Sequence, residues 1–158
     1  MKSHPGHRGL DVVLSVDIEQ ARLHSLGELR AGIRVNERLL ESFSVVLLYQ
    51  LPDWPKAVAL FRVNGDHGEH ANEGGEIISG PHTHLAPPQR QGLPPGPAFK
   101  ARFAEALDGR YRALTFAWDL FCRRANVVDG EKMAKVVARL YTDLAQGELD
   151  DLLTLPDS

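Results

Sequence analysis

The stretch FSVVLLYQL, residues 43–51, decides the fold of this chain. It is apolar on both faces of an extended chain and rich in β-branched and aromatic residues, which is typical of a strand in the middle of a sheet. The next apolar run, AVALFRV at 57–63, follows after a proline-containing link of hairpin length. The two runs are therefore predicted to pair as neighbouring strands.

Further elements are predicted on both sides of this pair. Upstream, residues 33–40 read as another strand, and Asp17 stands three residues before Gln20 as in a capping box, which predicts a helix over 17–30. Downstream, EIISGPHTHL at 76–85 predicts a returning strand beside 57–63, with Gly80 and Pro81 marking a bulge or an edge.

Helices are predicted in the last third of the chain, over 98–108, 112–125 and 131–146. The second should bury Leu114, Trp118, Phe121 and Cys122; the apolar stripe of the third contains Met133, Val136, Val137, Leu140, Tyr141 and Leu144. The order helix, strands, helices predicts an α+β fold: a small antiparallel sheet of about four strands, with an N-terminal helix and two to three C-terminal helices packed on it.

A length of 158 residues suits a single domain, with a flexible tail at 1–10, a core domain at 11–127 and a C-terminal helix and tail at 128–158. The chain has no apolar run long enough for a bilayer span, and its first ten residues lack the apolar stretch of a signal peptide. We therefore expect a cytoplasmic protein without membrane association. Cys122 is the single cysteine, so the chain forms no internal disulfide and no multi-thiolate zinc site.

The net charge of −3 argues against a uniformly basic nucleic-acid-binding surface. Basic residues nevertheless outnumber acidic ones between residues 86 and 126. They either line solvated helix faces or form a local basic surface; they are Arg90, Lys100, Arg102, Arg110, Arg112, Arg123 and Arg124.

Histidine is the unusual residue in the composition. Four of the seven histidines, His67, His70, His82 and His84, fall within eighteen consecutive residues. In a strand, His82 and His84 point to the same face because side chains alternate with a period of two. If 57–63 is the partner strand, the loop that carries His67 and His70 starts beside them, so the four imidazoles are predicted to meet at the end of one hairpin.

Three uses of such a cluster remain open. The imidazoles can serve as general acid and base without a metal, as metal-independent ribonucleases require, with Arg62 stabilising negative charge. They can bind zinc, nickel or iron together with Asp66 or Glu69. They can also be structural, hydrogen-bonding the irregular backbone of the glycine-rich loop together with Asn64 and Asn72. The sequence contains no dinucleotide-binding, P-loop, zincin or serine-hydrolase motif.

The histidine segment resembles a family of small bacterial proteins found in prophages and other mobile elements. The resemblance covers residues 17–127 and rests on V-N-G-x-H-x-x-H-x-N, a Gly turn, I-x-G-P-H-x-H and C-x-x-x-N-V. The residues concerned are Val63, Asn64, Gly65, His67, His70, Asn72, Gly74, Ile78, Gly80, Pro81, His82, His84, Cys122, Asn126 and Val127. More loosely, the order of an arginine-bearing strand, a histidine cluster, a turn and a histidine pair is similar to the TumE-type toxins of toxin–antitoxin systems. A proline-rich link replaces the family's strand after the last histidine.

This resemblance implies a mobile-element or toxin-like role in which the histidines are the working residues. The leading hypothesis is an endoribonuclease-like hydrolase or transferase acting on RNA or nucleotides, with no cofactor and with an antitoxin or another protein as a partner. In it His82 and His84 are acid and base, His67 and His70 assist them, and Arg62 stabilises charge. The alternative is a non-catalytic binding or regulatory protein, in which the four histidines bind a transition metal such as zinc or brace the loop.

Overall fold

The computed structural model describes residues 9–14, 27–36, 39–50, 52–53, 55–66, 68–72, 74–85 and 103–153. For residues 9–14, 103 and 147–153 it describes the backbone alone. Among the helices described, none combines the length and the apolar character needed to cross a bilayer.

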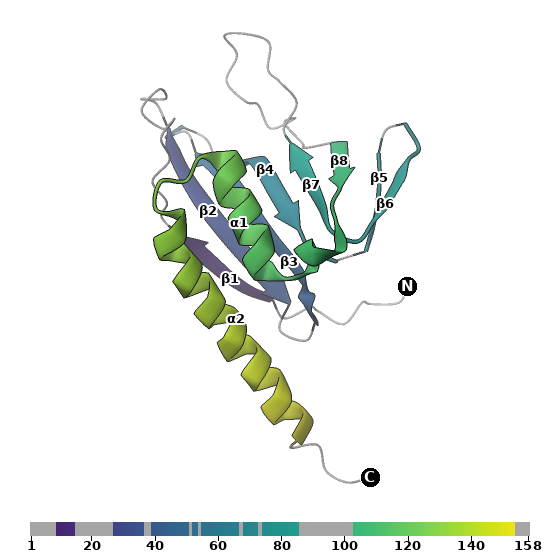
Figure 1. Cartoon of the computed structure of the whole chain (residues 1–158). Helices are drawn as coiled ribbons and strands as arrows, with labels where there is room; N and C mark the ends of the chain where they lie inside the picture. Colours follow the sequence, from purple (N-terminus) through teal and green to yellow (C-terminus); the bar gives the residue numbers. More distant parts are fainter. Residues whose placement is uncertain are drawn as a thin grey trace.

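The centre of the molecule is a six-stranded antiparallel sheet with the order β1-β2-β3-β4-β7-β8 (Figure 1). Along the chain, the segment between β4 and β7 forms a separate two-stranded sheet, β5-β6. The strands are β1 Gly9–Leu14, β2 Glu28–Asn36, β3 Leu39–Gln50, β4 Val58–Asn64, β5 Glu69–Ala71, β6 Ile77–Ser79, β7 His82–Leu85 and β8 Phe103–Ala106.

Strand β3 lies in the interior of the sheet, as its sequence predicts, with β2 on one side and β4 on the other. Side chains alternate along it: Val45, Leu47 and Tyr49 are buried, whereas Val46 and Leu48 between them are half-buried. The two sets point to opposite faces because successive side chains of a strand do so. The predicted pairing of 76–85 with 57–63 is confirmed for β7, which is antiparallel to β4. It is wrong for the first part of that segment, because β6 pairs with β5 in the separate hairpin.

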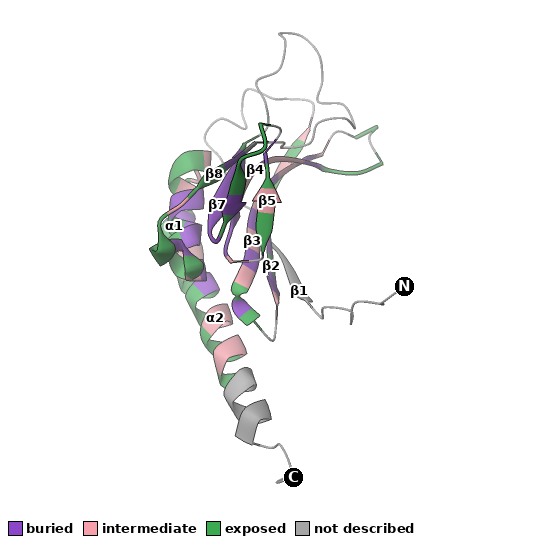
Figure 2. Cartoon of the chain, turned by 90° about the vertical axis from the view of Figure 1, so that its right-hand side faces the viewer, coloured by how far each residue is buried: buried purple, intermediate pink, exposed green. Residues whose placement is uncertain are grey.

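Helices cover one face of the sheet (Figure 2). The 3-10 helix η2, Gly109–Arg112, leads into α1, Leu114–Ala125, and then α2, Gly130–Leu153. The α1 helix packs on β3 and β4, where the ring of Phe121 stacks on Phe61 at a centroid distance of 5.9 Å and on Trp118 at 5.5 Å. Ile33, Val45 and Val63 also belong to this apolar core.

The prediction of a helix over 17–30 is wrong for the part of this range that the structure describes. Glu28–Asn36 is a strand, because Ala31, Ile33 and Val35 bury every second side chain, a period that fits a strand and no helix. Residues 15–26 lie outside the described part of the chain. Of the ten residues predicted as a flexible tail, Gly9 and Leu10 belong to β1, and residues 1–8 lie outside the described part of the chain.

The prediction of a helix over 98–108 is also wrong for residues 103–108, which the structure describes. Phe103–Ala106 is strand β8, which pairs with the outer edge of β7, so a strand does follow the last histidine after the proline-rich segment. The sheet consequently has six strands where about four were expected.

The two later helices are confirmed, with shifts at their ends. α1 starts at Leu114, and α2 passes through Gly147 and continues to Leu153, beyond the predicted end. Leu114, Trp118 and Phe121 are buried as expected, and Cys122 is half-buried. In α2 only Val136 departs from the predicted apolar stripe, since half of its surface is exposed.

Candidate functional site

The face of the sheet opposite α1 carries a polar set of side chains. Strand register places His84 opposite Arg62 and His82 opposite Asn64. Residues paired directly across two antiparallel strands share a face. Because Phe61 and Val63 turn toward α1, the intervening Arg62 and Asn64 turn away from it, together with the two histidines. The prediction that His82 and His84 share one face is confirmed.

The β5-β6 hairpin adds His70 to this pair. The ring centroid of His70 lies 4.5 Å from that of His84 and 6.0 Å from that of His82, and the His82 and His84 centroids are 4.9 Å apart. Three imidazoles therefore converge, as the hairpin geometry predicted. His67 lies outside the described residues, so its place in the cluster stays a prediction.

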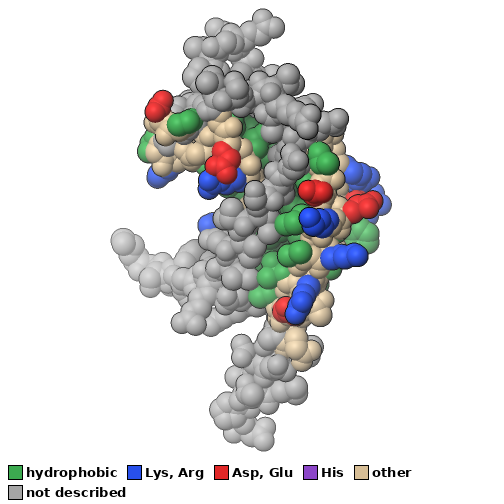
Figure 3. Space-filling view, turned by 90° about the vertical axis from the view of Figure 1, so that its left-hand side faces the viewer, with side chains coloured by type: hydrophobic (Ala, Val, Ile, Leu, Met, Phe, Trp, Pro, Cys, Tyr) green, Lys and Arg blue, Asp and Glu red, His purple; other side chains and the backbone are tan. Residues whose placement is uncertain are grey.

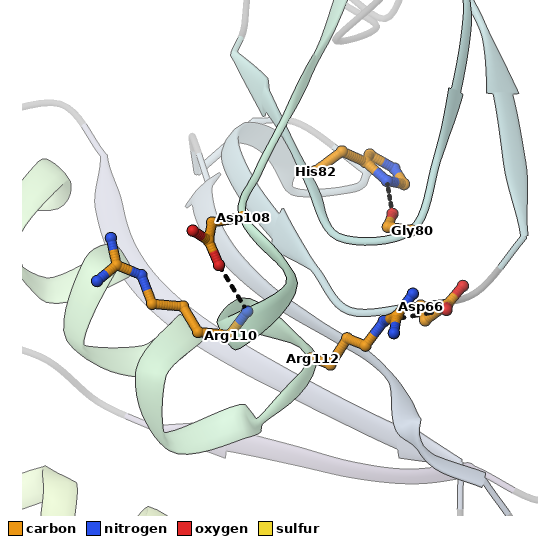
Figure 4. Close-up of polar contacts among 6 residues, drawn as sticks. All are labelled: Asp66, Gly80, His82, Asp108, Arg110 and Arg112. Atoms are coloured by element: carbon orange, nitrogen blue, oxygen red, sulfur yellow. Dashed lines mark hydrogen bonds and ion pairs between the residues drawn. The ribbon is translucent and has the colours of Figure 1, made fainter.

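His82 is fully buried and uses both ring nitrogens, and Figure 4 shows its contact with Gly80. Its Nδ1 lies 2.7 Å from the carbonyl oxygen of Gly80, and its Nε2 lies 3.1 Å from Nδ2 of Asn64. Gly80 has a φ of 77°, a conformation that favours glycine, and this brings its carbonyl back toward the ring two residues later. His84 is 6% exposed and His70 is half-buried, so the cluster is largely shielded from solvent.

Asn72 attaches the β5-β6 hairpin to the outer strand of the sheet. Its side-chain Oδ1 accepts a hydrogen bond from the backbone N–H of Ala104 at 2.8 Å, and its Nδ2 donates to the Ala104 carbonyl at 3.0 Å. The amide thus pairs with β8 as a residue of a neighbouring strand would. The structural alternative expected Asn64 and Asn72 to hydrogen-bond the glycine-rich loop. Asn72 does so through Glu76 and Gly75 in addition to its bonds with β8, whereas Asn64 contacts His82.

Arg62 supplies positive charge beside the imidazoles. Its side chain is half-buried, and its Nε has no hydrogen-bond partner within the described chain. Burial, and after it the positive charge of Arg34, lowers the pKa of Arg62 from its ordinary value. Arg34 lies on β2, and sequence reasoning did not single it out, because only the register of three strands shows that it shares the face of Arg62.

The carboxylates proposed as metal ligands do not complete a site in the described residues. Asp66 forms an ion pair with Arg112 at 3.4 Å (Figure 4), and Glu69 is exposed on β5. Over the described residues, no three His, Cys, Asp or Glu side chains are arranged to hold a metal ion. A metal on Nε2 of His82 would also have to displace the Asn64 amide.

The basic residues of 86–126 that are described lie mostly in ion pairs. Arg112 pairs with Asp66, Arg123 with Asp119, and Arg124 with Glu105, while Arg110 lies over the Tyr111 ring. The remaining three, Arg90, Lys100 and Arg102, lie outside the described part of the chain. Figure 3 shows charges of both signs interspersed with hydrophobic side chains on the helical side. These four residues thus favour the interpretation of solvated helix faces over that of a basic surface.

Cys122 behaves as a core residue. It packs against the apolar cluster between sheet and helices, and burial, followed by the negative charge of Asp119, raises the pKa of its thiol to about 12. A thiol with such a pKa is protonated at neutral pH and is a poor nucleophile.

Comparison of the chain with family models, with curated proteins and with solved structures found no match. Function is therefore inferred from the sheet face that carries Arg62, Asn64, His82 and His84, the histidine face.

Proposed function

We propose that the protein is a metal-independent enzyme that acts on phosphodiester bonds of RNA or on nucleotides, using the imidazoles of the histidine cluster. The observation that carries this proposal is the convergence of His70, His82 and His84 beside Arg62 on one face of the sheet.

Proton transfer is the first requirement of such a reaction. Cleavage of RNA without a metal needs one group that takes a proton from the attacking hydroxyl and one that gives a proton to the leaving oxygen. Imidazole is suited to both tasks because it exchanges protons near neutral pH. Ring centroids 4.5 to 6.0 Å apart place the rings close enough to serve one scissile bond.

Charge stabilisation is the second requirement. The transition state of phosphoryl transfer concentrates negative charge on the non-bridging oxygens, and guanidinium groups bind such oxygens well. Arg62 is registered opposite His84, and the positive charge of Arg34 is near enough to lower the pKa of Arg62. An anion bound between them would relieve that repulsion, so this face favours phosphate over a neutral ligand.

The biological role is inferred from the resemblance of the sequence to mobile-element proteins and TumE-type toxins. We propose that the activity is growth-inhibiting in the bacterial cytoplasm and that a protein partner, such as an antitoxin, restrains it. His67 belongs to the proposal as a fourth imidazole of the cluster.

A second candidate is favoured by one specific observation, the two hydrogen bonds of His82. They brace the Gly80 turn, as expected for a non-catalytic protein whose histidines are structural. In that case, elemental analysis of the untagged protein should show no stoichiometric transition metal, and replacing His82 should lower the melting temperature. A stoichiometric transition metal would instead favour metal binding by the histidines.

The test is expression of the wild type, His84→Gln and Arg62→Ala in bacteria, followed by growth curves and analysis of total RNA. Purified proteins are then assayed on a fluorogenic RNA oligonucleotide in the presence of a chelator. Arg139→Ala is the matched control for Arg62→Ala, because the Arg139 side chain is 85% exposed on α2. We expect RNA cleavage by the wild type and by Arg139→Ala, and a loss of about 10²–10⁴-fold in His84→Gln. Intact RNA with all four proteins would overturn the proposal.

A further inference from the structure

The hydrogen bonds of His82 separate its role from those of the other two imidazoles. A backbone carbonyl only accepts hydrogen bonds, so the contact with Gly80 requires a proton on Nδ1 of His82. Neutral His82 then presents a lone pair on Nε2. The Nδ2 amide group of Asn64, 3.1 Å away, is a donor that fits this lone pair.

The surroundings disfavour the charged form of this ring. His82 has no exposed surface, and burial penalises an imidazolium. Among the described residues, the groups next to it are Asn64 opposite it on β4, His84 of its own strand and His70 of β5, and Arg62, registered opposite His84, shares their face. Arg62 adds positive charge to this set, which further disfavours a second proton on His82.

We propose that His82 is a positioning residue, held as the neutral Nδ1–H tautomer by Gly80 and Asn64, and that His84 and His70 exchange protons with substrate. His82 acts through its ring, which packs edge-on against His84 at 4.9 Å and faces His70 at 6.0 Å. Asn64 is the second positioning residue, because its amide sets the tautomer. The division of roles rests on the proposed function, whereas the tautomer does not.

The tautomer is tested by long-range ¹H–¹⁵N spectra of the full chain, with His70→Gln, His82→Asn and His84→Asn used to assign the rings. We expect His82 to show the neutral Nδ1–H pattern throughout about pH 5 to 8, the range in which free imidazole titrates. In Asn64→Asp the carboxylate accepts from Nε2, so His82 should change to the doubly protonated pattern. Asn64→Leu is the control of similar size without a charge.

The spectrum of the wild type decides the question even if the Asn64 variants fail to fold. A proton on Nε2 with none on Nδ1, or titration of His82 like an exposed histidine, would overturn the proposal.

The division of roles is tested by the pH dependence of cleavage of the fluorogenic RNA. An Asn at position 82 can still donate to the Gly80 carbonyl, so His82→Asn should lose no more than about tenfold and keep both limbs of the pH profile. His84→Asn should lose about 10²–10⁴-fold and one limb. Loss of a limb in His82→Asn would assign proton transfer to His82 and contradict the proposal. If the wild type cleaves no RNA while the spectra show the expected tautomer, the proposed function fails and the tautomer assignment stands.

Discussion

The two faces of the six-stranded sheet differ in the polarity of their side chains, although the same strands contribute to both. On one face Val45, Phe61 and Val63 pack under α1 in an apolar core. On the other, alternate residues of the same strands, Arg62 and Asn64, meet the histidines of β7. A shift of register by one residue would exchange the two sets, so the strand register fixes both the core and the candidate site.

The two faces also differ in what they contribute to the free energy of folding. Burial of apolar side chains on the helix-covered face is favourable. The histidine face instead buries polar atoms. Within the described chain, three of these have no hydrogen-bond partner: Arg62 Nε, Asn64 Oδ1 and His70 Nε2. Such atoms cost about 1–3 kcal/mol each unless water, a ligand or another part of the chain binds them.

The largest expected effect of a single substitution lies on the helix-covered face. Trp118 is 1% exposed, stacks on Phe121 and donates from Nε1 to the Gly130 carbonyl. Trp118→Ala should lower the free energy of unfolding by about 3–5 kcal/mol, measured by urea denaturation, because it leaves a large cavity. The control is Phe116→Ala, a 53% exposed aromatic on the same helix, which should cost less than about 1 kcal/mol. Equal losses would show that α1 does not pack as described.

An intermediate effect is expected where the hairpin joins the histidine face. Asn72→Ala removes two hydrogen bonds to Ala104 and should cost about 1–3 kcal/mol, at 0.5–1.5 kcal/mol each. Hydrogen exchange of the Ala104 amide should accelerate in the variant. Thr142→Ala removes an exposed side-chain bond to a helix carbonyl and serves as the control with little effect. An unchanged exchange rate at Ala104 would contradict the attachment of the hairpin.

The smallest effect at neutral pH concerns Cys122. Burial raises the pKa of its thiol from 9.0 to about 12, so the folded state holds this proton more tightly than the unfolded state. The associated stability is complete below about pH 9 and is lost as the pH rises toward 12. At pH 8, alkylation by iodoacetamide should be much slower for the folded chain than in urea. Asp119→Asn, which removes the second cause of the shift, should quicken the reaction modestly. Equal rates in the folded and unfolded chain would exclude a shielded thiol.

The parts of the fold that follow from local periodicity could be predicted from the sequence. Apolar residues on both faces of FSVVLLYQL indicate an interior strand, and a period of two places His82 and His84 on one face. The glycine-rich turn between β5 and β6 similarly returns the chain so that His70 reaches the pair.

The rest depends on contacts distant in sequence. Residues 103–106 have an apolar spacing compatible with a helix, but the open edge of β7 offers hydrogen bonds that a strand satisfies, and tertiary context overrides propensity. The partner of Asn72 is 32 residues away, and no local pattern encodes that distance. The same holds for Arg34, which reaches the face of Arg62 only across β3.

The Asn72 amide has a consequence for how molecules of this protein meet one another. An outermost strand normally exposes a row of free N–H and C=O groups, which can recruit a strand from a second molecule and begin aggregation. At Ala104 both groups are already occupied by a side chain of the same chain. The hairpin that carries His70 therefore also blocks, at Ala104, the pairing of a strand from a second molecule with the edge strand β8.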